Sequence, residues 1–218
     1  MMKLHSKSNG ETFFEAAAAH CKQYLEGDPN DFQSTYLLAE ADLRLGRVHE
    51  AVKGFEDASQ LDPTSAGPFA RLANLYLREG KDAKARRLID SGLERDPLDA
   101  VALFVHGKLL LKEGRRDEAE EAFRDSLAAN PSEAAVQMQL ADILIEQKRA
   151  REAESILAKG VVQEPDNPWL HFALGRAQAA SGQDEKAAQS FRRSLELNPA
   201  QPELRRLLEQ YDAQKAER

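Results

Sequence analysis

The residues best suited to chemistry gather in one short stretch of the sequence. Residues 164–175, EPDNPWLHFALG, hold two prolines, an Asp-Asn pair, the single Trp of the chain and His171. An imidazole near a carboxylate is a common pair for general acid–base catalysis, and histidine is also a frequent metal ligand. The other histidines are His5, His20, His49 and His106. They are spread along the chain, and no pair has the short helical spacing of a metal site.

Other catalytic groups are equally sparse. His106 stands in a column of leucines, where a histidine with satisfied hydrogen bonds is more common than a catalyst. Cys21, the only cysteine, stands in a column of bulky residues and is predicted to be buried, where it acts as a small hydrophobe. The sequence has no glycine-rich phosphate loop and no serine-centred nucleophile elbow. We predict that the chain is not an enzyme and carries no cofactor and no metal.

Composition narrows the classes of protein to which the chain can belong. Its 218 residues are 42% hydrophobic and 31% charged, as in ordinary globular proteins. The net charge is −7 and the basic residues are scattered, so we predict no nucleic-acid partner. No apolar run approaches the roughly 20 residues that span a bilayer, so we predict no direct membrane insertion. The N-terminal residues lack the apolar core of a secretory signal, which favours a cytoplasmic location; a periplasmic or membrane-associated one applies if a leader or anchor is missing from this chain.

The prolines reveal an internal repeat. Successive members of one series are each separated by 34 residues: Pro29, Pro63, Pro97, Pro131, Pro165 and Pro199. Proline lacks an amide proton and restricts the residue before it, so each member of the series ends a helix. Polar residues that can cap a following helix stand shortly beyond: Asp31, Ser65, Asp99, Ser132 and Asn167.

A second break stands halfway between the prolines. Its residues are Gly46, Gly80, Gly114 and Gly182, each after an apolar stretch. The fourth repeat has Lys148 instead, and we predict that its turn is built differently. Each repeat therefore reads as a first helix, a short turn, a second helix and a proline.

Columns of small and bulky residues recur at the same period. One column is entirely alanine: Ala51, Ala85, Ala119, Ala153 and Ala187. A bulky column runs beside it: Phe55, Ile89, Phe123, Leu157 and Phe191. Small residues let helix backbones approach and large residues fill the gaps, so the columns predict closely packed antiparallel helices.

This unit resembles the tetratricopeptide repeat, as in LANLYLREGKDAKARRLIDSGLERDP and LGRAQAASGQDEKAAQSFRRSLELNP. The resemblance implies an all-α fold, a right-handed α-solenoid of antiparallel helix pairs. It gives these predicted parts: a flexible segment 1–10; a repeat array 11–201, made of a half-unit 11–31 and repeats 32–65, 66–99, 100–133, 134–167 and 168–201; and a C-terminal capping helix 202–218. The half-unit corresponds to a second helix alone, with Tyr24 where other repeats have a small residue.

Some residues depart from the pattern of that family. Thr35, Gln137 and His171 occupy a position that is usually a bulky aromatic. Asp42 and Gln178 occupy another position that is usually apolar. We expect these departures to affect local packing and not the fold.

The resemblance also implies where a partner binds, because the first helices of such repeats line a concave groove. We expect this groove to hold an amphipathic helix or an extended segment of a partner protein, in a scaffold that assembles a multiprotein complex. The predicted groove residues are Tyr36, Glu40, Leu43, Asn74, Leu77, Phe104, Lys108, Leu111, Met138, Asp142, Trp169, Phe172 and Arg176. In the stretch 164–175 only Trp169 and Phe172 remain as candidate contacts, and the rest reads as the joint between two repeats.

Three other binding modes are conceivable for such a chain. The family's clamp for a C-terminal carboxylate needs Lys and Asn side chains that no window of this chain supplies, so we predict no such ligand. Helical repeats that read RNA are usually basic and follow a different period, which makes RNA binding the weaker alternative. Self-assembly into a homo-oligomer is the third, since the N-terminal half-unit leaves an apolar edge.

Overall fold

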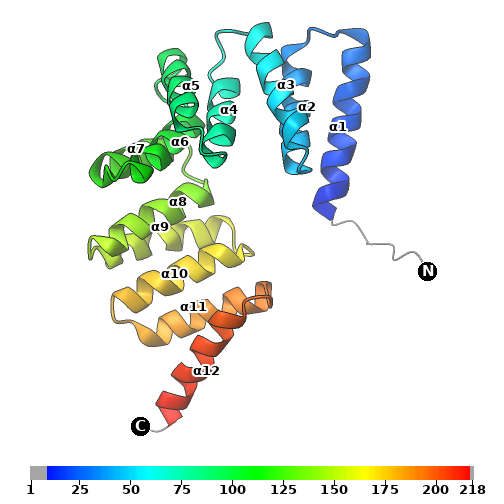
Figure 1. The fold of residues 1–218 in the computed structure, drawn as a ribbon. Helices are drawn as coiled ribbons and strands as arrows, with labels where there is room; N and C mark the ends of the chain where they lie inside the picture. The colour runs from blue at the N-terminus through cyan, green and yellow to red at the C-terminus, as the bar shows by residue number, and fades with distance from the viewer. Residues whose placement is uncertain (1–8, 217–218) are drawn as a thin grey trace, which may run out of the picture. The chain divides into compact units, whose positions relative to one another are not determined.

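Residues 9–216, the part of the chain that the computed structural model describes, contain twelve α-helices and no strand (Figure 1). They divide into two compact units, Met1–Lys112 and Glu113–Arg218. Of the predicted flexible segment 1–10, residues 1–8 lie outside the described part, and the first helix begins at Asn9. The prediction of an all-α fold of helix pairs is confirmed.

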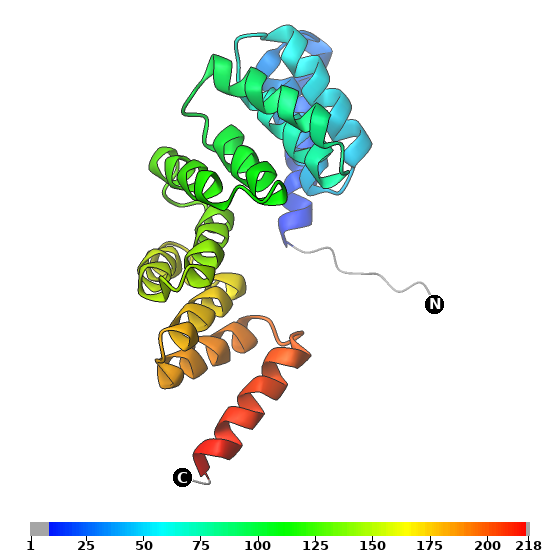
Figure 2. The same ribbon diagram turned by 60° about the vertical axis from the view of Figure 1, so that its left-hand side comes forward.

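The described residues of the N-terminal unit form six helices joined by short turns (Figure 2). Their bounds are α1 Asn9–Gly27, α2 Phe32–Arg44, α3 Val48–Leu61, α4 Gly67–Arg78, α5 Asp82–Arg95 and α6 Ala100–Lys112. Helix α2 packs on α3 and α4 packs on α5, and α1 packs on α2. In each of the first two pairs the earlier helix is the first helix of a repeat and the later one its second helix.

The C-terminal unit also has six helices in its described residues. Their bounds are α7 Arg116–Ala129, α8 Ala134–Glu146, α9 Ala150–Gln163, α10 Pro168–Ala180, α11 Asp184–Leu197 and α12 Pro202–Ala216. Within it α8 packs on α9, α10 packs on α11, and α12 packs on α11. No helix among the described residues is long and apolar enough to cross a membrane.

The predicted helix caps are confirmed in part. Asp31 accepts a hydrogen bond from the Ser34 amide at 2.7 Å, and Asn167 accepts one from the Trp169 amide at 3.0 Å. The side chain of Asp99 likewise accepts from the amide three residues later. Ser65 and Ser132 were wrongly predicted as caps: α4 and α8 each begin one residue later, after Ala66 and Glu133, without a side-chain cap.

The turn within each repeat uses one left-handed residue. The four glycines of this column have φ between 74° and 80°, as their lack of a Cβ allows. Lys148 adopts the same conformation, with φ 63°. Its neighbour Arg149 donates an amide hydrogen bond to Leu144 at 2.7 Å, which matches the bond from Arg47 to Asp42 at 2.8 Å in the first repeat. The prediction that the fourth turn is built differently is therefore wrong.

The repeating columns form the cores of both units. In the N-terminal unit Ala51 and Phe55 are fully buried in one cluster with Ala85 and Ile89. In the C-terminal unit Ala187 and Phe191 lie in a cluster with the α12 leucines Leu204 and Leu208. Burial of these apolar faces supplies most of the stabilisation of such helix pairs, because a helix of this length is marginal alone.

The two terminal helices present different surfaces. Helix α1 buries Ala18 and Cys21 against its neighbour but leaves Phe13 67% and Tyr24 61% exposed. Tyr24 fits at this otherwise small position because its ring points largely into solvent. Helix α12 buries Leu204 and Leu208 on α11 and leaves Leu207 exposed, and its other described side chains are mostly charged and exposed. A capping role for this helix stays a prediction, with which its polar outer surface is compatible.

Candidate functional site

Five of the predicted groove residues hold the same position of successive repeats and are polar: Glu40, Asn74, Lys108, Asp142 and Arg176. Within each unit, two neighbouring members of this polar column pair with one another. Lys108 Nζ donates to Asn74 Oδ1 at 2.9 Å, and Arg176 Nη1 donates to Asp142 Oδ1 at 2.6 Å. Each pair joins residues that are 34 positions apart in neighbouring first helices of one unit. Burial, followed by the charge of Arg78, lowers the pKa of Lys108. Within each unit these polar side chains are thus held in place by hydrogen bonds to one another.

Glu40, the first member of that column, belongs to a cluster that the sequence reasoning missed. Arg71 Nε lies 2.5 Å from Glu40 Oε1 and 3.4 Å from the hydroxyl oxygen of Tyr36. The contact with Glu40 is an ion pair and lacks hydrogen-bond geometry. Burial works against the charge of Arg71, but Glu40 and Tyr36 outweigh it and raise the pKa of Arg71. Arg71 follows Ala70, which holds the repeat position of Tyr36 and Phe104. A charged residue directly after this groove position was the sequence signal that could have indicated the cluster.

The groove position held by Tyr36, Phe104 and Phe172 is mostly aromatic, and its rings are partly buried. Tyr36 stacks on Phe32 with ring centroids 6.0 Å apart and also contacts the core residue Phe55. Burial raises the pKa of the Tyr36 hydroxyl, with opposition from Arg71. Phe104 lies under the Lys108 ammonium group, which is 5.3 Å from its ring centroid. Both rings are therefore half-buried and pack against the core cluster of the N-terminal unit.

Another repeat position of the predicted groove, held by Leu43, Leu77 and Leu111, contributes less to the surface. Leu43 and Leu111 are half-buried, and Leu43 packs against the core cluster of the N-terminal unit. Leu77 is only 8% exposed and belongs to that cluster. Because α4 is surrounded by α3, α5 and α6, Leu77 differs from the prediction and is left out of the surface proposed below.

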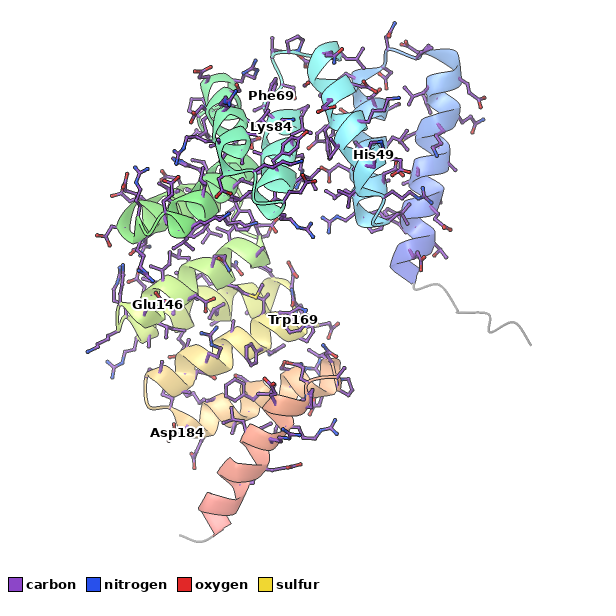
Figure 3. All side chains as sticks on the ribbon, in the orientation of Figure 1. His49, Phe69, Lys84, Glu146, Trp169 and Asp184 are labelled. Carbon is purple, nitrogen blue, oxygen red and sulfur yellow. The ribbon has the colours of Figure 1, made fainter. Side chains whose placement is uncertain are left out.

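In the C-terminal unit the most exposed groove candidate is Trp169. Its side chain projects from the first turn of α10 and is 52% exposed (Figure 3). Phe172, one turn later, is half-buried and lies 5.8 Å from the ring centroid of Phe191. Met138 on α8 is half-buried too. Among the three apolar groove candidates of this unit, Trp169 is therefore the most exposed.

A pocket in the N-terminal unit shows which repeat positions face the same surface. It has a volume of about 480 Å³ and is lined by Phe32, Gln33, Tyr36, Thr64, Ser65, Ala66, Gly67, Asp96 and Asp99. Gln33 and Gly67 hold the same position of their repeats that Trp169 holds in the last repeat. The sequence reasoning named Tyr36 in this pocket and missed its other walls, which come from the loops before α4 and α6.

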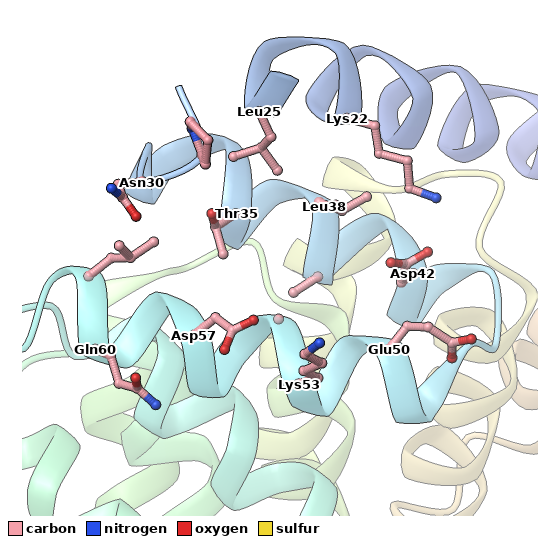
Figure 4. A pocket seen from close by; sticks show the side chains of 14 residues that line it. Lys22, Leu25, Asn30, Thr35, Leu38, Asp42, Glu50, Lys53, Asp57 and Gln60 are labelled. Carbon is pink, nitrogen blue, oxygen red and sulfur yellow. The ribbon is translucent and has the colours of Figure 1, made fainter. Parts of the chain in front are cut away.

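A second pocket, of about 550 Å³, lies among α1, α2 and α3 and was not predicted (Figure 4). Residues of α1, α2 and α3 line it, including Lys22, Asp42, Lys53 and Asp57. Gly54, one of the lining residues, replaces the larger residues of the other repeats. A Cβ at this position would lie 2.8 Å from that of Ala39. The walls carry charges of both signs, which favours no particular ligand charge.

The stretch 164–175 is a structural joint. His171 is buried and bonds the Pro165 carbonyl, and Asn167 caps α10. Elsewhere Cys21 is buried as predicted, and burial, aided by Asp31, raises the pKa of its thiol. No group of three potential ligands for a metal ion occurs among the described residues. His5 lies outside them.

Comparison with protein families matches the tetratricopeptide repeat along almost the whole chain. One profile of this family matches residues 46–104 and 110–164, a second matches 168–201, and a third matches 11–66. The first of these alone spans more than half of the chain. A search of curated protein sequences finds no match.

Solved structures show the same fold at low sequence identity. The anaphase-promoting complex assembly Cut9–Hcn1 matches with a TM-score of 0.78 and 17% identity, over 90% of this chain and 39% of that one. The match thus spans about two fifths of that relative's length. YrrB, described as having an unusual peptide-binding site, matches with a TM-score of 0.57 and 17% identity, over 87% and 98%. PilW, a type IV pilus biogenesis factor, matches with a TM-score of 0.67 and 21% identity, over 89% and 90%. The helix pairs, their 34-residue period and these matches lead to one conclusion: the chain belongs to the tetratricopeptide repeat family.

Proposed function

We propose that this chain is a binding scaffold that holds a peptide segment of a partner protein on the face formed by its first helices. We call this face the first-helix surface; in the N-terminal unit it comprises Tyr36, Glu40, Asn74, Phe104 and Lys108, and in the C-terminal unit Met138, Asp142, Trp169, Phe172 and Arg176. The half-buried Leu43 and Leu111 lie at its edge. A role in protein–protein interaction is typical of the family, and YrrB is a relative with a peptide-binding site.

The exposure of Trp169 carries this proposal. A tryptophan with half of its surface in water is costly in apolar hydration unless a partner covers it, and Trp is a typical anchor residue of interfaces. Arg176 stands on α10 with Trp169, and it pairs with Asp142 on α8, the preceding first helix. An apolar anchor beside oriented polar groups suits an amphipathic helix or an extended segment.

The test is selection of binding peptides with no prior choice of partner. A phage library of random 16-residue peptides is selected on the immobilised full chain, and synthetic copies are titrated by fluorescence anisotropy. We expect Trp169→Ala or Lys108→Ala to weaken a selected peptide by about tenfold, the usual cost of truncating an anchor residue.

Matched controls lie on α9, on a second-helix face. Val162, which is 81% exposed, is replaced by Ala, and so is the exposed Lys159. We expect both variants to bind the peptide like the wild type. Failure to select any peptide, or equal affinity of all four variants, would remove the proposal.

Self-assembly through α1 is a second candidate function, favoured by one observation. Phe13 and Tyr24, about three helical turns apart on α1, are both more than half exposed and form an apolar edge. The charged surface of α12 disfavours head-to-tail stacking onto that edge, so a two-fold contact between α1 helices is the form to test. Sedimentation velocity across a dilution series should show dimers that Phe13→Ser with Tyr24→Ser abolishes; a monomer at all concentrations excludes this candidate.

A further inference from the structure

The pocket at the start of the first helices in the N-terminal unit has an unusual set of walls. One wall is the stacked pair Phe32 and Tyr36 on α2. The opposite side is the α5–α6 connection, with Asp96 and Asp99. None of the nine lining residues is a lysine, arginine or histidine. The pocket therefore joins two carboxylates and two aromatic rings in a space of about 480 Å³.

The carboxylates are held in place by their own loops. Asp96 Oδ1 accepts from the Leu98 amide at 2.9 Å, and Asp99 Oδ1 accepts from the Ala102 amide at 2.7 Å. Both bonds use Oδ1, so each side chain has a second oxygen with which to bind a ligand. The two groups are thus oriented before any ligand arrives.

The aromatic wall is equally fixed. A Cβ added at Gly67 would lie 3.2 Å from the hydroxyl oxygen of Tyr36, so this ring packs directly on the α4 backbone. Arg71 holds the same hydroxyl from the side. Arg71 forms an ion pair with Glu40 and also interacts with the charge of Asp99, so the carboxylates around the pocket, Glu40, Asp96 and Asp99, outnumber this one guanidinium group. The space in front of the rings therefore keeps a negative character.

We propose that this pocket binds a lysine or arginine side chain of the partner segment. The proposal rests on the proposed function above and specifies the chemistry of its ligand. A cation over an aromatic face is attracted by the ring quadrupole, and charge-assisted hydrogen bonds to carboxylates add to this attraction. An arginine suits both walls, since its planar group can stack on a ring and still donate to a carboxylate.

The charge can be removed without changing the loops. In the double variant Asp96→Asn with Asp99→Asn, each amide oxygen can still accept the local backbone hydrogen bond, and Asn caps helices as well as Asp does. Asp62 offers a matched control, because it precedes a proline of the same series and accepts from the Thr64 amide at 2.9 Å. Asp62 is outside the pocket lining, so Asp62→Asn removes one nearby charge only.

The experiment uses the peptides selected on the full chain. We expect a basic residue at one fixed position of these peptides. Its replacement, arginine by citrulline or lysine by norleucine, should weaken binding to the wild type by about tenfold, as for a hydrogen-bonded charge. In the Asn double variant the same replacement should change affinity by less than about twofold, whereas Asp62→Asn should behave like the wild type.

Each outcome decides between the two proposals. If no peptide is selected, both fall. If Trp169→Ala or Lys108→Ala weakens the selected peptides, the binding scaffold stands. If, in addition, these peptides lack a basic residue at a fixed position, the cation pocket is overturned. It is likewise overturned if replacing the basic residue weakens binding equally in the wild type and in the Asn double variant. Retained circular dichroism of the Asn variant shows that its loss of coupling is not a loss of fold.

Discussion

The imidazole Nε2 of His171 donates a hydrogen bond to the carbonyl oxygen of Pro165 at 2.8 Å. Gln137 makes the same bond to Pro131 at 2.9 Å, and Arg205 makes it to Pro199 at 3.1 Å. In all three cases the acceptor belongs to the proline series, six residues earlier. Gln137 and His171, which depart from the family pattern at this position, therefore satisfy a carbonyl group that a bulky apolar residue would leave to solvent or to another side chain. Thr35, the third departure, donates to the Asp31 carbonyl instead.

This relationship predicts which substitutions of His171 the fold accepts. His171→Gln should change the free energy of unfolding by less than about 0.5 kcal/mol, because glutamine already does this work in the preceding repeat. His171→Ala should cost about 1 to 3 kcal/mol, since a buried acceptor loses its donor. Urea unfolding followed by Trp169 fluorescence measures both. Equal stability of the two variants would show that the bond contributes nothing.

Close packing of α10 on α11 gives a second prediction. A Cβ at Gly175 would lie 2.5 Å from the ring of Phe191, which is buried and cannot move aside cheaply. Gly175→Ala should therefore destabilise the C-terminal unit by about 1 to 3 kcal/mol, although alanine favours helices. In Gly27→Ala, where nothing lies within 4 Å of the new atom, stability should be unchanged or slightly higher. An increase in both variants would contradict this packing.

The left-handed turn in the fourth repeat gives a third prediction. Lys148 has a Cβ in a conformation that disfavours one, at a cost of about 1 kcal/mol. Lys148→Gly should raise the thermal midpoint by a few degrees. In the neighbouring repeat Gly114→Ala should lower it, since φ there is 80°. If the lysine variant melts earlier than the wild type, the lysine side chain must stabilise the turn in a way that outweighs the strain.

The sequence predicted the helix pairs because a strict period repeats the same physical constraint five times. Each proline of the series ends a helix, and each glycine of the glycine column marks a turn. Ala51 and Phe55 can be buried only if neighbouring helices approach closely. Lys148 shows the limit of this reasoning: residue type suggested a different turn, but the flanking repeats impose the same backbone.

The candidate surface could be predicted only in outline. Repeat position indicated that Tyr36 and Trp169 face outward from first helices. It could not show how far each ring is buried, nor that Arg71 would reach across to Glu40, because side-chain length and direction decide such contacts. The pocket beside Asp96 and Asp99 depends on two loops and two helices at once, and no single column of the repeat contains it.

A four-membered charge network in the C-terminal unit predicts how stability depends on pH. Glu120 receives Arg124 and Arg149 at 2.8 and 2.9 Å, and Glu152 receives the same two arginines at 2.5 and 2.6 Å. Burial works to raise the pKa of Glu120, but the hydrogen bonds from these arginines outweigh it and lower the pKa. Hydrogen bonds from both arginines also lower the pKa of Glu152.

A lowered pKa in the folded state means that stability from these carboxylates is present above the ordinary glutamate value, about 4.3, and is lost as pH falls through the lower folded value. The side chain of Glu120 is 12% exposed and that of Glu152 is 40% exposed, so solvent screens the second more strongly. Between pH 5.5 and 3.5 the wild type should therefore lose about 0.5 to 1 kcal/mol more than Glu120→Gln. The exposed neighbour Glu121 provides the control, because Glu121→Gln should keep the wild-type pH dependence. Urea titrations at each pH measure the difference, and identical slopes for the wild type and Glu120→Gln would show that the network does not stabilise the unit.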